Sequence, residues 1–382
     1  MRAAVRLAFV ATALGAAPAA LAVDVGDGQL SLHGNGEWSY QRTLHQNSYL
    51  AAPPRGSYEN AQFDLLVTAR AADDLVITGQ MGFDQEAVSA EWVFAEWRFS
   101  DRLRLRAGKI FQPLGNYAEL RYAGTARPFF TLPTSVYGPS NISADALYGA
   151  AITGQWVTEG GWNLGYDLYA GGTGAEEVEP YEALALDPAD PGYADAAAEV
   201  VETEARHVRD VLGARLSLTP PDDLVLRASA YAGHLGRGRP GQPSSVLTWG
   251  LSAMYRGEQL WLSAEGFQII EFDEEEALSG YVSAAWYFTE HLQGCLRWEK
   301  THVTFEGMSG PMSQLQHHEE LAVGLNWWVN PNFVFKGSWH VIDGNRFAFP
   351  ADITLGELAA LTAAGGLHWR TNAFVVGTQF SF

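Results

Sequence analysis

The 382-residue sequence is 47% hydrophobic but only 18% charged, and it is rich in glycine and aromatic residues. This charged share is below the roughly one quarter that is usual for soluble domains. If the basic residues Arg2 and Arg6 are removed with a leader, 22 basic residues (24 minus 2) and all 44 acidic residues remain, a net charge of about −22. Such an acidic chain argues against nucleic acid as a partner.

Residues 1–22 have the pattern of a secretory signal peptide. A basic start is followed by an apolar stretch that ends near residue 17, and small residues flank a cleavage position before Val23. The apolar stretch is shorter than the roughly 20 residues that span a bilayer, so an N-terminal anchor helix is the weaker alternative. We therefore expect a signal peptide at 1–22 and a single domain at 23–382.

Beyond residue 22, apolar residues alternate with small or polar residues with a period of two. No apolar run of 18 or more residues interrupts this pattern, so we expect strands and no membrane-spanning helix. A first strand is expected near Gln29–Tyr40. The alternation is clearest at 162–169, 247–253, 333–340 and 373–382.

Short and long breaks in this pattern alternate strictly along the chain. The seven short breaks are rich in Asp, Gly, Pro and Asn, as tight turns are. They lie at 71–74, 100–102, 158–161, 219–223, 256–258, 289–291 and 330–332. The eight longer breaks lie at about 41–57, 84–87, 110–145, 171–205, 235–244, 271–276, 304–317 and 342–371. Fifteen connections predict sixteen strands.

Alternation alone fits either a soluble antiparallel sheet or a membrane barrel. The sorting of all long connections to one side favours a transmembrane antiparallel β-barrel, which has short periplasmic turns and long external loops. An even strand number lets the first strand pair with the last, and lipid requires such closure. Aromatic residues near the expected strand ends predict interfacial girdles: Trp38 and Tyr40, Trp92 and Trp97, Trp286 and Tyr287, Trp327 and Trp328.

A sixteen-stranded barrel is too wide to be filled by its own wall side chains, so it encloses a water-filled channel. The connection at 110–145 is the longest, and we expect this third external loop to fold inward and narrow the channel. The strand before it carries arginines at alternate positions, which we expect to face the lumen. The predicted constriction residues are Arg98, Arg102, Arg104, Arg106, Lys109, Glu119, Arg121 and Arg127.

This basic group has two interpretations. Closely spaced guanidinium groups beside a narrow channel would concentrate anions and disfavour cations. Alternatively, the arginines pair with carboxylates, brace the barrel and give only weak selectivity. Counted over all expected strands, inward basic and acidic residues are nearly balanced.

These features resemble those of the Gram-negative trimeric porins, through the signal peptide, sixteen alternating strands, the long third external loop and the final Phe382. The segment from Arg106 to Gly115 is similar to a motif of the phosphate-selective porin O and P group, although the chain has no dense lysine array. The resemblance implies export through the periplasm to the outer membrane, contact with its lipid and lipopolysaccharide, and a homotrimer. It also implies that the barrel-assembly machinery reads Phe382.

The predicted function is a porin for passive diffusion of small hydrophilic solutes, with a lean towards anions. We expect no enzyme activity, catalytic residue, cofactor or metal site. The alternatives are an adhesin or receptor that uses its long loops, or an outer-membrane enzyme. The densest titratable cluster, His317–Glu320, starts a strand whose neighbouring residues point to opposite faces, so it cannot form one catalytic site.

Three further local features can be predicted: an acidic connection, a short helix and a buried cysteine. The connection at 171–205 carries ten acidic residues. It is either a solvated, repelling loop or a divalent-cation site near lipopolysaccharide or a neighbouring subunit. Residues 352–364 could form a short helix that is capped by Asp352 and ended by Gly365. Cys295 lies inside a strand and is expected to be a packed thiol.

Overall fold

The computed structural model describes residues 23–25, 29–49, 53–84, 87–138, 142–173, 208–235, 245–271, 275–305 and 310–382. The expected signal peptide and almost all of the acidic connection at 171–205 lie outside these ranges. No helix among the described residues is long and apolar enough to cross a membrane.

Sixteen antiparallel strands form one closed barrel, as predicted. Each strand pairs with the next, and the last pairs with the first. The strands are β2 Leu30–Leu44, β4 Ser57–Arg70, β5 Leu75–Phe83, β6 Val88–Ser100, β7 Leu103–Ile110, β8 Leu147–Val157, β9 Asn163–Gly172, β10 Val208–Thr219, β11 Leu224–Leu235, β12 Ser245–Arg256, β13 Leu260–Glu271, β14 Glu275–Tyr287, β15 Leu292–Phe305, β16 His317–Asn330, β17 Phe333–Asp343 and β19 Arg370–Ser381.

The closing seam joins β19 to β2 in antiparallel register, with Gln379 opposite Glu37 and Phe374 opposite Arg42. Phe382 extends the seam, since its N–H donates to the Gly34 carbonyl at 2.9 Å and its carbonyl accepts from the Gly34 N–H at 3.0 Å. Closure leaves no open strand edge, which the hydrocarbon core of a membrane requires.

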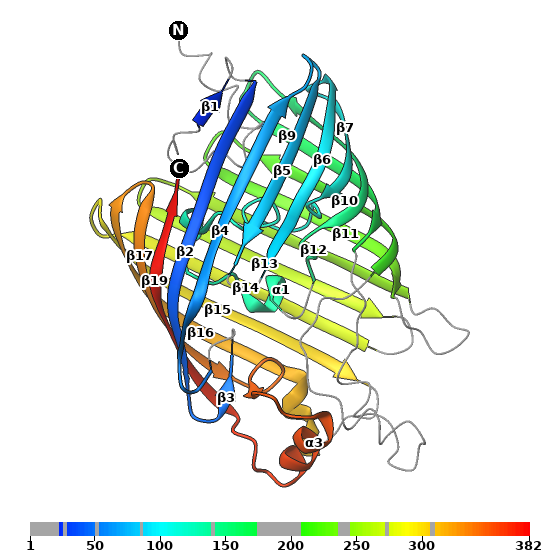
Figure 1. Cartoon of the computed structure of the whole chain (residues 1–382). Helices are drawn as coiled ribbons and strands as arrows, with labels where there is room; N and C mark the ends of the chain where they lie inside the picture. Colours follow the sequence, from blue (N-terminus) through cyan, green and yellow to red (C-terminus); the bar gives the residue numbers. More distant parts are fainter. Residues whose placement is uncertain are drawn as a thin grey trace.

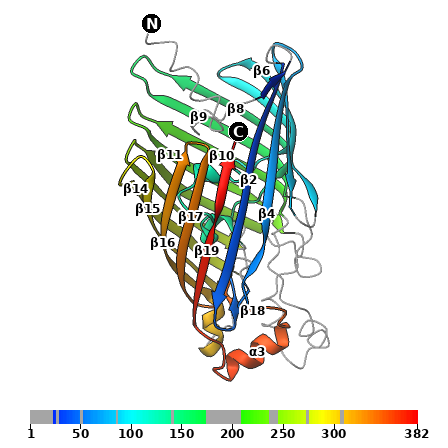
Figure 2. The same cartoon turned by 60° about the vertical axis from the view of Figure 1, so that its left-hand side comes forward.

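The two ends of the barrel differ (Figures 1 and 2). The start of β2 and the end of β19 lie at the end that holds the short turns. The opposite end holds the longer connections, which include the β3–β18 pair (Asn47–Ser48 and Phe349–Pro350) and helix α3 (Leu355–Ala363). A further short strand, β1 (Val23–Val25), pairs with β2 and was not predicted.

Alternate residues face the outside and the inside of the barrel, as the period of two predicts. Leu251 is 61% exposed on the outer face, whereas its neighbour Ser252 is 6% exposed on the inner face. In β19, Phe380 and Phe382 lie on the outer face, and Gln379 is buried inside, as predicted.

In three of the four predicted aromatic pairs, only one residue faces outward. Trp97, Trp286 and Trp327 are exposed on the outer face, but their predicted companions Trp92, Tyr287 and Trp328 face inward. The reason is strand geometry: Trp286 and Tyr287 are adjacent, as are Trp327 and Trp328, so they must point to opposite faces. Inside the barrel, the rings of Tyr287 and Trp328 lie 6.3 Å apart.

The predicted short helix forms, but its start was assigned to the wrong residue. Thr354 caps α3, because its side chain accepts from the N–H of Glu357 while the Glu357 carboxylate accepts from the Thr354 N–H. Asp352 lies before the helix with a φ of 57°. Gly365, with a φ of 66°, follows the helix as predicted.

Candidate channel constriction

The described residues of the connection between β7 and β8, 111–138 and 142–146, lie within the barrel and are named the inner segment here. It contains a short 3₁₀ turn, η1 (Gly124–Ala126), and one helical turn, α1 (Thr134–Tyr137). Figure 1 shows α1 between the front and back walls of the barrel. Leu114, Val136 and Ile142 are fully buried, so the inner segment packs closely.

Carboxylates and arginines of β9–β13 hold the first half of the inner segment. Glu119 pairs with Arg215 of β10, and Arg215 also bonds Asp167 of β9 at 2.9 Å. Burial alone would raise the pKa of Glu119, but the Arg215 guanidinium outweighs it and lowers the pKa to about 2. Glu265 of β13 accepts from the Asn116 N–H at 3.0 Å.

The second half of the inner segment bonds to strands β14–β19 and β2. Glu299 of β15 accepts from the Ser135 N–H at 2.8 Å. The other donors come from the wall and reach backbone carbonyls of the segment: Arg297 to Thr131 at 2.9 Å, Asn326 to Pro128 at 2.7 Å, Lys336 to Gly124 at 2.9 Å and Gln379 to Phe130 at 3.3 Å. Arg127 pairs with Glu37 of β2 at 3.3 Å. These bonds fix the second half of the segment against this arc, while Tyr122 and Asp145 of the segment bond to Glu91 and Trp92 of β6.

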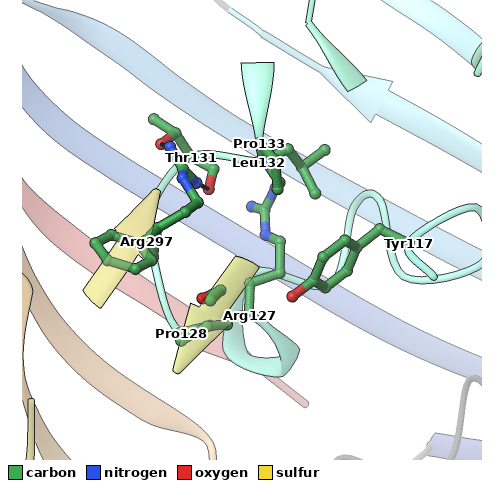
Figure 3. Close-up of a pocket in the computed structure, with 9 residues that line it drawn as sticks. Tyr117, Arg127, Pro128, Thr131, Leu132, Pro133 and Arg297 are labelled. Carbon is green, nitrogen blue, oxygen red and sulfur yellow. Dashed lines mark hydrogen bonds between the residues drawn. The ribbon is translucent and has the colours of Figure 1, made fainter. Parts of the chain in front are cut away.

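A small cavity between this arc and the inner segment shows how tightly they pack (Figure 3). Arg297 extends from β15 to Thr131, and Arg127 lies between this part of the segment and Tyr117. The cavity measures about 10 Å³, which is room for about one water molecule. At this cavity the inner segment and the β14–β15 wall leave no room for a solute larger than water.

The opposite arc, β4–β8, carries the predicted arginine row. Arg98 and Arg106 each bond one oxygen of Glu96, both at 2.6 Å. Arg104 lies 3.7 Å from Asp101, and Arg102 is exposed in the turn before β7. The side chains of Arg98, Arg104 and Arg106 remain 41%, 13% and 17% exposed. The row is therefore partly neutralised but reaches solvent inside the barrel.

Lys109 was wrongly grouped with the lumenal residues. It pairs with Val93 and Tyr148, which are both exposed on the outer face. Its ammonium lies 5.4 Å from the centre of the Tyr148 ring and donates to the Ala90 carbonyl. Side chains alternate between the two faces of a strand. Lys109 lies an even number of residues after Leu103 and Leu105, so it points to the same outer face.

The three charged residues predicted within the inner segment are all buried and paired. Glu119 bonds Arg215, and Arg127 bonds Glu37. Arg121 pairs with Asp145 and donates to the Ser143 carbonyl at 3.0 Å, so it joins two parts of the same segment. These contacts place Glu119, Arg121 and Arg127 in the packing of the segment rather than on an open channel surface.

The inward charged residues that the sequence analysis counted as nearly balanced include Glu96, Arg215, Glu265, Glu299 and Glu320, for which no individual role was predicted. Each is buried and bonded to an arginine or to the inner segment. In the sequence, the sign that these residues have a role is that each places a charge on the inward face of a strand. The cluster His317–Glu320 divides between faces as predicted, with His318 and Glu320 inward and fully buried.

No protein-family model matches the sequence, and no curated protein matches it. The fold does match solved structures. These include OmpF of Salmonella typhi in complex with daunomycin, with a TM-score of 0.60, 12% identity and coverage of 94% of this chain and 100% of the other. The anion-selective porin from Comamonas acidovorans has a TM-score of 0.56, 10% identity and coverage of 92% and 99%. The outer membrane channel DcaP of Acinetobacter baumannii has a TM-score of 0.58, 7% identity and coverage of 92% and 97%.

These similarities span almost the whole of each compared chain. The chain therefore has the sixteen-stranded barrel fold of Gram-negative outer-membrane porins, as the sequence predicted. The identities are low, so the likeness concerns the fold alone.

Proposed function

We propose that this porin-like barrel is a water-filled channel of a Gram-negative outer membrane through which small hydrophilic solutes diffuse passively. One observation carries the proposal: most bonds of the inner segment reach the arc from β10 through β19 to β2, while Arg98, Arg104 and Arg106 on the opposite arc keep partly exposed side chains. Two further bonds join the segment to β6: the Tyr122 hydroxyl donates to Glu91, and Trp92 donates to the Asp145 carbonyl. A sixteen-stranded barrel is wider than its wall side chains can fill. These observations support a passage beside β4–β8, next to the exposed arginine side chains.

The charges along this passage support a weak anion preference. The inner faces of β4–β8 hold four arginines, Arg70, Arg98, Arg104 and Arg106. Three carboxylates, Asp64, Glu91 and Glu96, lie on the same arc. One excess positive charge in a narrow passage raises the local concentration of anions modestly.

The lysines argue against a dedicated phosphate channel. The chain has three, Lys109, Lys300 and Lys336. Lys109 and Lys300 face outward, and Lys336 is buried under the inner segment, where it donates to the Gly124 carbonyl. The arginines of β4–β8 are thus the cations that solutes would meet.

We also propose that the barrel assembles as a homotrimer in contact with outer-membrane lipid and lipopolysaccharide. Large apolar side chains such as Leu212, Leu251 and Leu278 are exposed on its outer face, and one similar structure is described as a trimer form, that of OmpT from Vibrio cholerae (TM-score 0.53, 9% identity). Chemical cross-linking of the purified protein should give a ladder that ends at three chains. A ladder that ends at one or two chains would contradict the trimer.

Liposome swelling tests the diffusion function. Vesicles that contain the purified barrel should swell in solutions of small neutral sugars, at rates that fall as the sugar grows. Vesicles prepared with heat-denatured protein provide the control. Equal swelling in both preparations would contradict the diffusion function and would favour the receptor, adhesin and enzyme alternatives.

A further inference from the structure

We propose that Glu299, His318 and Glu320 form a buried site for a divalent transition-metal ion that ties the inner segment to the barrel wall. Glu299 lies on β15 directly opposite Glu320 on β16. His318 lies two residues before Glu320, so it shares the inner face. One ligand atom from each of the three side chains lies within 4.8 Å of the others.

The histidine gives the second reason for this assignment. His318 is fully buried, and neither of its ring nitrogens has a hydrogen-bond partner among the described residues. Its ring lies against Tyr49 and Phe347, with centroid distances of 5.7 and 5.0 Å. Buried ring nitrogens without partners are unfavourable. A metal ion bound to one of them removes part of this cost.

Arg297 occupies the position that the ion would share. Its Nη2 lies 2.9 Å from Glu320 Oε1 and 3.2 Å from Glu299 Oε1. Two carboxylates and one guanidinium leave one net negative charge in a closed site. A divalent cation bound between the carboxylates must displace Arg297 Nη2 from them, and it changes the net charge of the site from one negative to one positive.

The ligand set indicates the class of metal. One imidazole nitrogen with two carboxylate oxygens suits Zn²⁺ and similar first-row ions better than Ca²⁺ or Mg²⁺, which prefer all-oxygen sites. The surroundings hold both carboxylates in place. His340 Nδ1 lies 2.8 Å from Glu320 Oε1, and the Ser135 N–H donates to Glu299 Oε2 at 2.8 Å. Such outer contacts orient metal ligands.

The site has consequences for the channel. Ser135 belongs to α1, so an ion on Glu299 also stabilises the position of the inner segment. Tyr49 and Phe347, from two external connections, cover His318. The ion must therefore bind while the barrel folds, and it should then exchange slowly.

Metal content after folding provides the test. The full chain is refolded from urea into detergent with Zn²⁺, washed briefly with EDTA, desalted and analysed for zinc. Wild type should retain about one zinc per chain. His318→Gln should retain at least ten-fold less. His317→Gln is the matched control, because His317 is the next residue on the same strand but faces outward near His302 and Glu319.

Two results would overturn the proposal: zinc absent from wild type, or zinc retained by His318→Gln and lost from His317→Gln. Heat-modifiable migration on gels shows whether each variant has folded. If His318→Gln fails to fold, anomalous diffraction at the zinc edge from the wild type decides. A peak at Glu299, His318 and Glu320 supports the site, and a peak elsewhere or none contradicts it. The zinc test does not measure conductance, so its outcome is independent of whether the barrel conducts solutes.

Discussion

Arg106 Nε lies 2.6 Å from Glu96 Oε2 across the paired strands β6 and β7, and Arg98 bonds the other oxygen of the same carboxylate. One negative charge therefore serves two guanidinium groups. These bonds agree with the interpretation that carboxylates brace the arginine row, and the anion preference stays a prediction. The row is braced by Glu96, and it still carries excess positive charge.

Glu96→Gln should increase the anion preference, because it removes the carboxylate that partly neutralises Arg98 and Arg106. One unit of charge near the passage changes the local ion concentration roughly two-fold at 0.1 M salt. The permeability ratio, from the reversal potential in a salt gradient, should change by a similar factor. Glu319→Gln makes the same chemical change on the outer face and should have no effect. Equal shifts in both variants would contradict the position assigned to the passage.

Glu119→Gln should loosen the inner segment. The change breaks a buried ion pair with Arg215, which keeps its bond to Asp167. We therefore expect the free energy that holds the inner segment in its packed position to fall by about 2 kcal/mol. Cys295 reports the outcome, because its thiol is buried and donates to the Pro128 carbonyl of the segment at 3.4 Å. Maleimide should label it up to roughly thirty-fold faster in the variant.

The matched control for this labelling is Glu276→Gln, since Glu276 lies on the outer face and bonds Gln268. It should label as slowly as wild type. Fast labelling of the folded wild type would show that the segment does not cover Cys295.

The same ion pair predicts a pH dependence. The pKa of Glu119 is lowered to about 2, below the ordinary value near 4.3. The contact therefore stabilises the packed segment fully above the ordinary value, and this stabilisation is lost as the pH falls from there through about 2. Conductance fluctuations should be constant between pH 7 and 5 and increase below about 4. In Glu119→Gln this acid-dependent increase should be absent. A rise between pH 7 and 5 in wild type would contradict the assignment.

Gly34→Ala should weaken the seam at Phe382, which we propose as the residue read during barrel assembly. A Cβ at position 34 would lie 2.2 Å from two atoms of the Phe382 ring, so the ring must move. We expect the free energy of unfolding to fall by about 1 kcal/mol, at the low end of the range for overpacking, because the clash is with the far end of a ring that is 38% exposed. The measurement is the temperature at which the folded gel band disappears. Gly266→Ala is the control, since a Cβ there meets nothing within 4 Å.

The strands and their faces could be predicted because they depend on neighbouring residues. Leu103 and Leu105 alternate with Arg104 and Arg106, and this local pattern sets the outer and inner faces. The same rule places Lys109 outside, so that error came from grouping residues by charge. The cap of α3 was also readable, since Thr354 and Glu357 have the spacing of a capping box.

The contacts of the inner segment could not be predicted, because they join distant parts of the chain. Glu119 and Arg215 are 96 residues apart, and Lys336 and Gly124 are 212 apart. No local pattern encodes which inward carboxylate meets which arginine. For the same reason the sequence does not indicate that Glu299, His318 and Glu320 meet across two strands.

Single-channel recording in a planar bilayer with a salt gradient tests the central claim most directly. We expect stepwise conductance and a reversal potential whose sign shows a weak preference for anions. The double substitution Arg104→Gln and Arg106→Gln should reduce this anion preference. Absence of conductance from correctly folded protein would contradict the channel. A cation preference that persists after removal of both arginines would contradict the role of the β4–β8 arc.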